Sequence, residues 1–191
     1  NRRSRGLGDV YKRQNKYNLD YPSVSKLNPE IIYCSITGFG QTGPYADRLG
    51  YDFIIQALSG IMDLTGEPDG EPQKMGVAFA DIFTGLYGVI AIQSALRVRE
   101  HSQKGQHIDL SLMDSMVAVL ANQASNYFVS GKSPKRMGNK HPNIVPYQVF
   151  KVKDGHLIIA VGNNEQFERF CKVIGLDYLC SSEEYNDNQK R

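Results

Sequence analysis

The sequence predicts an α/β fold that is followed by the start of a smaller α+β unit. Between residues 15 and 135, helical apolar patterns alternate with short strand-like runs, which is typical of α/β architecture. From about residue 140 two strand-like runs and one helical pattern follow each other, which favours an antiparallel hairpin with a helix. Of the 191 residues, 41% are hydrophobic and 22% are charged, so the composition is that of globular domains and excludes disordered or collagen-like chains.

The first 14 residues form a basic segment that differs from the rest of the chain. They hold five basic side chains and one acidic side chain, and they show no apolar periodicity. The segment therefore carries the positive excess of the formal net charge of +2, and the remainder is slightly acidic. Because it resembles translated adapter sequence more than the start of a domain, we predict that residues 1–14 are a non-native leader. A basic arm that contacts nucleic acid or a membrane is the alternative.

Cysteine spacing and hydropathy exclude several classes of protein. The three cysteines, Cys34, Cys171 and Cys180, contain no CxxC pair, so neither a disulfide framework nor a zinc site is predicted. No apolar run approaches the ~20 residues of a membrane-spanning helix, and none near the start resembles a secretory signal. We expect a cytoplasmic protein, or a mitochondrial matrix protein if the source is eukaryotic, without metal, nucleic acid or membrane partners.

The elements within residues 15–135 are predicted from their apolar runs and from the glycine-rich or polar residues between them. Residues 31–36 form a nearly continuous apolar run, typical of a strand that is covered on both faces, and the loop TGFGQTGPY follows. Residues 52–64 and 82–99 place apolar side chains at helical spacing, and Gly105 is the expected stop of the second helix.

QHIDLSL then alternates as a strand with Ile108, Leu110 and Leu112 on one face, and residues 113–129 return to a helix. The polar stretch SGKSPKRMGNKHPNIVP predicts a domain boundary, so we assign residues 15–135 to one domain and residues 136–191 to the truncated start of a second.

The second domain begins with a hairpin signal. YQVFKVKDGHLIIAV contains two β-rich runs around Asp154-Gly155, a pair that type I′ turns favour. Asn163 or Asn164 is suited to cap the next helix, which Gly175 ends.

The glycine-rich loop TGFGQTGPY invites a phosphate-binding interpretation, because glycine-rich backbone before a helix binds anions. Its spacing matches neither GxGxxG nor GxxxxGK[ST], and Pro44 removes a backbone donor, so an ordinary strand-to-helix loop is favoured. The four histidines lack the spacing of metal ligands, and only His141, in the polar stretch GNKHPN, is expected near a ligand.

Asp81 directly precedes the apolar pattern of the second helix, and two interpretations stay open. One is an N-cap, which is common for aspartate at this position. The other is a nucleophile, because free amides and the helix dipole would keep the carboxylate ionised, and Gly76 and Gly85 leave room beside it.

Three further acids are weighed in the same way. Asp52, after Gly50 and Tyr51, has the same two interpretations as Asp81. Asp109 is expected to face solvent from a strand, and Asp114 is expected to cap a helix.

Five stretches of the sequence together resemble the CaiB/BaiF family of class III CoA-transferases. They cover nearly everything from about residue 15 onward: IIYCSITGFGQTGPYADRLGYD, RLGYDFIIQALSGIMDLTGEP, MGVAFADIFTGLYGVIAIQSALRVRE, GQHIDLSLMDSMV and GNKHPNIVPYQVFKVKDGHLIIAVGNNEQF. Within the family, the branch that uses succinyl-CoA and dicarboxylates of the glutarate type is the most similar, through IVPYQVFKVKDG and VGNNEQF.

The resemblance implies a fold, a reaction and a nucleophile. The fold would be part of a Rossmann-like large domain and the start of a small α+β domain. The reaction would move CoA from an acyl-CoA thioester to a small carboxylic acid, with the CoA thioester as substrate and no cofactor. Asp81, in ADIFTG, matches the family's catalytic aspartate, which forms a mixed acyl anhydride and then an aspartyl-CoA thioester.

The resemblance also implies the binding residues. The stretch that contacts the acyl-CoA would contain Leu49, Gly50, Tyr51 and Asp52. A cover over the site would come from residues 138–146, in which Gly138, Asn139 and His141 are the candidates, although this loop lacks the glycine run of the formyl-CoA branch. A packed loop aromatic remains the alternative for Tyr51, and a plain helix cap remains the alternative for Asp52.

Two other functions stay open beside the transferase. In the related α-methylacyl-CoA racemases a histidine base stands at the position of Tyr51, and tyrosine, with an unperturbed pKa near 10, is a poor substitute. A non-catalytic acyl-CoA-binding protein on the same fold is the second alternative. Family members form interlocked homodimers, and we expect the chain to be a fragment that has little or no activity when it is expressed alone.

Overall fold

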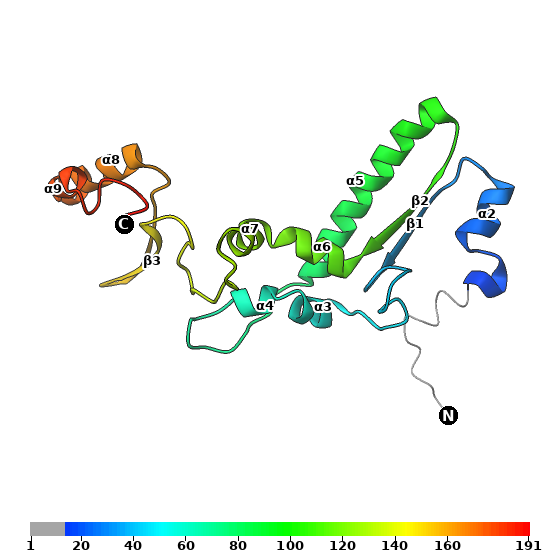
Figure 1. Cartoon of the computed structure of the whole chain (residues 1–191), viewed down its shortest axis with the longest axis horizontal. Coiled ribbons are helices and arrows are strands. Elements are labelled where there is room, and N and C mark those ends of the chain that lie inside the picture. Colours follow the sequence, from blue (N-terminus) through cyan, green and yellow to red (C-terminus); the bar gives the residue numbers. More distant parts are fainter. Residues whose placement is uncertain (1–13) are drawn as a thin grey trace. The chain divides into compact units, whose positions relative to one another are not determined.

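The computed structural model describes residues 14–191, which divide into two compact units (Figure 1). The first unit ends at Thr65 and resumes over Pro72–Pro134, and the second unit contains Gly66–Glu71 and Lys135–Arg191. The predicted leader lies outside the described residues except for Gln14. The short segment Gly66–Glu71 thus belongs to the second unit, although it interrupts the first unit in the sequence.

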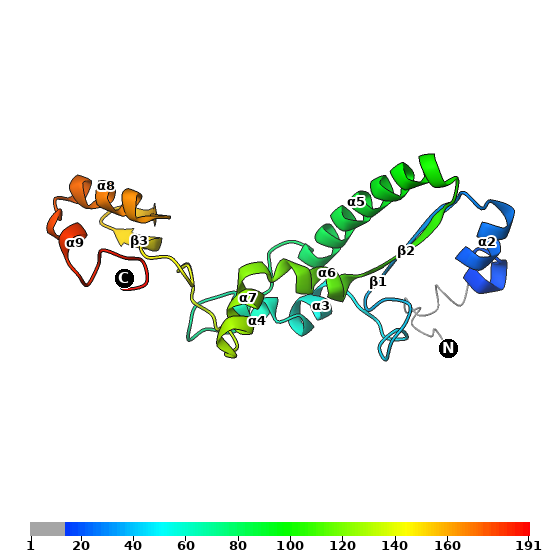
Figure 2. The ribbon, with the colours of Figure 1, turned by 45° about the horizontal axis from the view of Figure 1, so that its top comes forward.

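The first unit is built on two parallel strands, β1 (Ile32–Thr37) and β2 (Gln106–Ser111), with Cys34 opposite Ile108. Parallel strands need a long crossover, which here contains three helices. The longest of them, α5, runs beside both strands in two different views (Figures 1 and 2). The helices of this unit are α2 (Tyr21–Leu27), α3 (Asp52–Leu58), α4 (Ile61–Leu64), α5 (Phe79–Ser102), α6 (Leu112–Val119) and α7 (Ala121–Ser130).

The expected α/β class is confirmed, but two predicted helices are each divided. The predicted helix over 52–64 breaks at Gly60, whose φ of +84° is left-handed. The predicted helix over 113–129 breaks where Ala121 has a φ of +46°. Apolar spacing continues through both breaks, which is why the pattern alone does not reveal them.

Helix α5 begins three residues before its predicted start and ends at a different stop. Gln103, with a φ of +54°, is its C-cap, and its amide donates to the carbonyl of Arg99 at 2.9 Å. Gly105 serves another purpose, because a Cβ there would collide with the carbonyl of Ile31. Packing between two chain segments, and not helix termination, therefore requires this glycine.

The core of the first unit lies where α3, α5 and α6 meet. Its buried residues are Ile55, Ala80, Leu112 and Met116. Ala80, which has no exposed surface, holds the first turn of α5 against this core. Successive helical residues point about 100° apart, so Asp81 faces away from it. Strand β1 is not covered on both faces by the described residues, since the side chain of Ile36 is 46% exposed.

Helix α5 corrects the expectation that no segment is long and apolar enough to cross a membrane. Its 24 residues include a window with a mean hydropathy of 1.4, so it meets that requirement by length and composition. Small and uncharged polar residues within it, such as Thr84, Gly85 and Ser94, interrupt the apolar run without lowering the mean much. The helix packs on β1, β2, α3 and α6, as the central helix of an α/β unit does.

The second unit is an antiparallel hairpin with two helices. Its elements are β3 (Tyr147–Val152), β4 (Gly155–Ala160), α8 (Asn164–Ile174) and α9 (Tyr178–Ser181). Val152 pairs with Gly155, so the two loop residues are Lys153 and Asp154, and not the expected Asp154-Gly155. Neither loop residue has the positive φ that a type I′ turn would require, and Gly155 does not have it either.

Helix α8 of the second unit has the caps that the sequence predicts. The Asn163 side chain accepts a hydrogen bond from the Gln166 amide at 2.9 Å, and Gly175 ends the helix with a φ of +71°. Phe167 and Cys171 on the inner face of α8 pack with Val161 to form the core of this unit.

Candidate functional site

The site is centred on the first turn of α5, where Asp81 is the third helical residue. The N-cap of the helix is Ala78, whose methyl group cannot accept a hydrogen bond. The interpretation of Asp81 as an N-cap is therefore wrong, because the helix begins earlier than its apolar pattern shows. The interpretation as a nucleophile remains for this residue.

Asp52 provides the cap that Ala78 cannot provide. Its Oδ1 atom accepts a hydrogen bond from the Ala80 amide at 2.7 Å and a longer one from the Asp81 amide at 3.4 Å. Asp52 is the first residue of α3, and the N-cap of α3 is Tyr51, which makes no side-chain cap bond. Asp52 is thus a helix cap as one interpretation had it, but it caps a different helix from its own.

Gln56 completes this arrangement, although sequence reasoning missed it. Its side chain has no exposed surface, and its Nε2 donates to Oδ2 of Asp52 at 2.7 Å. Its Oε1 accepts a hydrogen bond from the Met75 amide at 2.9 Å. A buried amide needs such partners, because an unpaired polar group in a core is costly. The available signal was a glutamine within the apolar run FIIQAL, one turn after Asp52.

The Asp81 carboxylate is exposed and makes no hydrogen bond or ion pair with the described residues. Its pKa is raised above the ordinary aspartate value, first by partial desolvation and then by the negative charge of Asp52. This direction is opposite to the one expected from the helix dipole. The reason is that Asp52 already occupies the amides of the first turn and adds a like charge beside them.

Open space lies next to two glycines near Asp81. A Cβ built on Gly76 or on Gly85 would meet no atom within 4 Å beyond its local backbone. Gly85 is four residues after Asp81, which places both on the same face of α5. The face of α5 that carries Asp81 therefore has room at Gly85.

The predicted acyl-CoA contacts of the first unit lie in the segment that leads into α3. Gly50 is buried, and its Cα packs so closely on Gly38 that a Cβ on either would collide with the other. The side chains of Leu49 and Tyr51 are 40% and 55% exposed, so Tyr51 is not a packed loop aromatic. Through Asp52, the structure joins this segment to the turn that carries Asp81.

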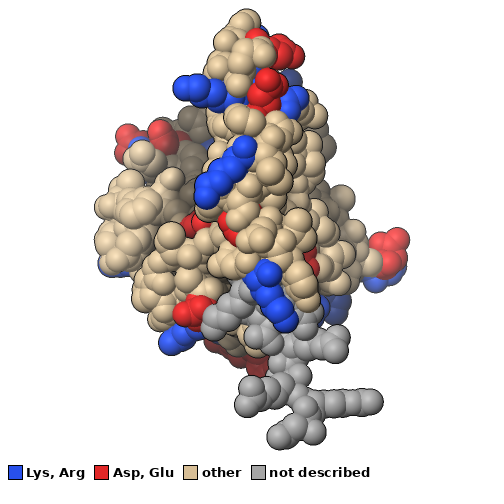
Figure 3. All heavy atoms as spheres, turned by 90° about the vertical axis from the view of Figure 1, so that its right-hand side faces the viewer, with Lys and Arg blue, Asp and Glu red and all other residues tan. Residues whose placement is uncertain are grey.

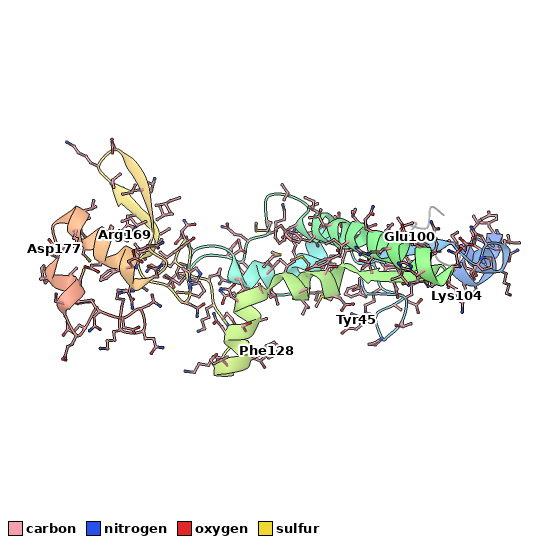
Figure 4. The ribbon with its side chains drawn as sticks, turned by 90° about the horizontal axis from the view of Figure 1, so that it is seen from above. Tyr45, Glu100, Lys104, Phe128, Arg169 and Asp177 are labelled. Carbon is pink, nitrogen blue, oxygen red and sulfur yellow. The ribbon has the colours of Figure 1, made fainter. Side chains whose placement is uncertain are left out.

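The glycine-rich loop after β1 is held by acceptors of the protein itself. The Gly40 amide donates to Oγ1 of Thr37 at 2.7 Å, and the Gln41 amide donates to Oδ2 of Asp109 at 3.0 Å. Two of its amides are thus occupied, in agreement with an ordinary strand-to-helix loop. Tyr45, labelled in Figure 4, belongs to the same loop. The Cζ atom of Arg48 lies over its ring, 4.0 Å from the ring centroid.

The prediction for Asp109 is confirmed, whereas the prediction for Asp114 is wrong. Asp109 is exposed on β2, as expected, and it also anchors the glycine-rich loop. Asp114 is not a cap, because Ser111 is the N-cap of α6 and accepts a hydrogen bond from the Asp114 amide at 3.2 Å. Asp114 is the third helical residue of α6, the position that Asp81 has in α5.

The remaining candidates, Gly138, Asn139 and His141, belong to the second unit. Gly138 has a φ of +60°, and its amide donates to the carbonyl of Gly66 at 3.0 Å. The His141 amide donates to the carbonyl of Tyr147 at 2.9 Å, and its Nδ1 accepts from the Asn143 amide at 3.0 Å. Asn139 is exposed. Their contact with an acyl-CoA stays a prediction.

The chain is similar to known CoA-transferases over nearly its whole length. A relative from Agrobacterium fabrum, named succinate–glutarate CoA-transferase, is 58% identical over 92% of this chain and 44% of its own. A succinyl-CoA:glutarate CoA-transferase from Mus musculus is 48% identical over 91% of this chain and 40% of its own. The chain thus spans less than half the length of these curated relatives.

Structural similarity agrees with these sequence matches. The crystal structure of a CaiB/BaiF family protein from Brucella suis has 62% sequence identity and a TM-score of 0.76, covering 95% of this chain and 48% of that one. The family model described as CoA-transferase family III matches residues 10–191. The chain therefore belongs to CoA-transferase family III.

Proposed function

We propose that this chain is part of a class III CoA-transferase, in which Asp81 is the nucleophile that carries the acyl group and then CoA. The single observation that supports this most is the state of the Asp81 side chain. Its carboxylate is exposed, has no hydrogen-bond partner among the described residues, and has open space at Gly76 and Gly85. A carboxylate that served as the cap of the helix would instead accept hydrogen bonds from backbone amides.

The proposed reaction divides one exchange into steps of covalent catalysis. An Asp81 carboxylate oxygen attacks the thioester carbonyl carbon, the C–S bond breaks, and CoA leaves as a thiolate. The product is a mixed anhydride between the acyl group and Asp81. The thiolate then attacks the aspartyl carbonyl carbon, so the donor acid leaves as a carboxylate and an aspartyl-CoA thioester remains.

The second half of the reaction uses the acceptor acid. Its carboxylate attacks the aspartyl-CoA thioester, which releases the thiolate and forms a second mixed anhydride. The thiolate attacks the acceptor's acyl carbon, which gives the new acyl-CoA and restores the Asp81 carboxylate. No proton is gained or lost overall, so the site needs to exclude water more than it needs an acid or base.

We propose dicarboxylates as the acids that this enzyme exchanges, with succinyl-CoA as donor and a glutarate-type acid as acceptor. The names of the relatives at 58% and 48% identity support this class of substrate. Homodimer assembly and a cytoplasmic or mitochondrial matrix location belong to the same proposal, and they rest on the family resemblance.

The test is to replace Asp81 in the full-length protein that contains this segment. Asp81→Asn and Asp81→Ala should lower kcat by at least about a thousandfold, because no other carboxylate takes over the covalent step. Mass spectrometry of the digested protein after mixing with succinyl-CoA should show an adduct on the peptide that contains Asp81, and this adduct should be absent from both variants.

Asp114→Asn is the matched control, since it removes an acid from the same helical position of α6. It should keep the adduct and most of the activity. Turnover by Asp81→Ala near the wild-type rate would overturn the role of Asp81 as nucleophile, and acyl-CoA binding without CoA transfer by the wild-type protein would leave a binding protein. Deuterium exchange at the α-carbon of the substrate without CoA transfer would instead indicate a racemase.

A further inference from the structure

We propose that Asp52 is a positioning residue for the nucleophile: its carboxylate caps α5 from outside the helix and leaves the Asp81 carboxylate free to react. This inference rests on the proposed function of Asp81. It differs from the expectation that Asp52 contacts the acyl-CoA, because both of its carboxylate oxygens are engaged within the protein.

The first step of the argument is the competition for the amides of the helix start. The first amides of a helix have no partner within the helix and attract the nearest acceptor. An acid at the third helical position is well placed to fold back onto such an amide, as in the capping box. Here Oδ1 of Asp52 accepts from the amides of Ala80 and Asp81, at 2.7 and 3.4 Å, so the start of α5 is capped from outside the helix and without the Asp81 side chain.

The second step is that Asp52 is itself held in place. Its Oδ2 accepts a hydrogen bond from Gln56 at 2.7 Å, and Gln56 is fully buried. The same glutamine accepts a hydrogen bond from the Met75 amide, so the chain that enters α5 is tied to α3 as well. A carboxylate with one oxygen on the buried amide and the other on the helix start has little freedom to turn toward a substrate.

The third step is electrostatic. Asp52 places a negative charge beside Asp81. This charge raises the pKa of the Asp81 carboxyl in addition to partial desolvation, which is the larger cause. A more basic carboxylate is a better nucleophile toward a thioester. Acylation neutralises Asp81, so the repulsion between the two carboxylates is present before the reaction and is relieved by it.

Among the described residues, Asp52 is the one charged group that shifts the Asp81 pKa. The elements packed on α5 carry other titratable groups, but these make no such contribution. They are Tyr33 and Cys34 on β1, His107 and Asp109 on β2, and Asp114 on α6, together with Tyr87, Arg97, Arg99, Glu100 and His101 on α5 itself.

The experiment compares Asp52→Asn with Asp52→Ala in the full-length protein. Asparagine keeps the Oδ1 acceptor for the helix start but removes the charge, whereas alanine removes both. We expect the acid limb of kcat/KM against pH to move to lower pH in both variants, because the like charge is gone. We expect kcat to fall about threefold to tenfold in Asp52→Asn and about tenfold to a hundredfold in Asp52→Ala, with the KM for acyl-CoA changed less than about threefold.

Ser111→Ala is the matched control, since it removes the cap of α6, a helix without the nucleophile. It should lower the melting temperature without moving the acid limb. Hydrogen exchange of the first turn of α5 gives a readout that does not depend on activity: exchange should be faster in Asp52→Ala and near wild type in Asp52→Asn.

Three outcomes would overturn the inference. One is a raised KM with unchanged kcat and acid limb, which would make Asp52 a ligand contact. Another is an equal shift of the acid limb in Ser111→Ala. The third is an Asp81 adduct that forms at the wild-type rate in both Asp52 variants. Absence of the adduct in the wild-type protein would overturn the proposed function itself, so the two failures are distinguishable.

Discussion

At the scale of single residues, Asp81 and Asp114 show how one chemical group takes two roles. Both are the third residue of a helix, and both amides are bonded to a capping oxygen. The cap of Asp114 is a neutral serine hydroxyl from its own helix, whereas the cap of Asp81 is a carboxylate from another helix. The Asp81 side chain therefore bears an electrostatic cost that a reaction can relieve.

This difference predicts the pH dependence of the full-length enzyme. In the proposed mechanism only the ionised Asp81 attacks a thioester, and the pKa of this carboxyl is raised in the folded protein. Activity should therefore be lost as pH falls through that raised pKa, at a pH above that of an ordinary aspartate. The measurement is kcat/KM for succinyl-CoA between about pH 3.5 and 8, which reports the free enzyme. An acid limb at or below the ordinary aspartate pKa would contradict the assignment.

At the scale of elements, the sequence identifies α5, the two parallel strands, the hairpin and α8 because each has a local signal. The breaks at Gly60 and Ala121 were missed, since the apolar spacing continues across both. The capping of α5 by Asp52 could not be predicted from local sequence, because Asp52 and Ala80 meet only after α3 packs on α5. Asp81 and its glycines were predictable from the motif, and Gln56 was not.

Gly85 of α5 offers a test of the open space beside Asp81. Glycine within a helix is less favourable than alanine by about 0.5–1 kcal/mol, and a Cβ at Gly85 meets no neighbour. Gly85→Ala should therefore raise the free energy of unfolding by about that amount. Gly85→Leu should fold, but it should raise the KM for acyl-CoA by about tenfold or more, because the side chain fills the space.

Gly88 is the contrasting position on the same helix. A Cβ there would lie 3.3 Å from Cδ1 of Leu110, so Gly88→Ala should gain less stability or lose some. Urea unfolding and steady-state kinetics measure both effects. An unchanged KM in Gly85→Leu would show that the substrate does not use this space.

At the scale of the whole molecule, the first unit shows much apolar surface. On α5, the side chains of Leu86, Val89 and Ile90 are 55%, 58% and 61% exposed, and Phe128 near the end of α7 is 80% exposed (Figure 4). Figure 3 shows one face on which charged side chains stand apart, with broad uncharged areas between them. The relatives are more than twice as long as their match to this chain, at 44% and 40% coverage.

We therefore expect the 191 residues, expressed alone, to bind a hydrophobic dye and to show little or no CoA transfer. Apolar patches of this kind bind such dyes or associate with each other. Dye fluorescence, light scattering and a succinyl-CoA assay beside the full-length protein provide the comparison. Turnover by the 191 residues at a rate comparable with the full-length protein would contradict this expectation.

The bond between Asp52 and the start of α5 has a consequence for protein engineering. A designer who transplants α5 into a new scaffold would leave its cap, Asp52, behind, because that residue is encoded in an earlier stretch of the gene. The two stretches, residues 49–58 and 75–85, have to be treated as one cassette and moved, recombined or randomised together.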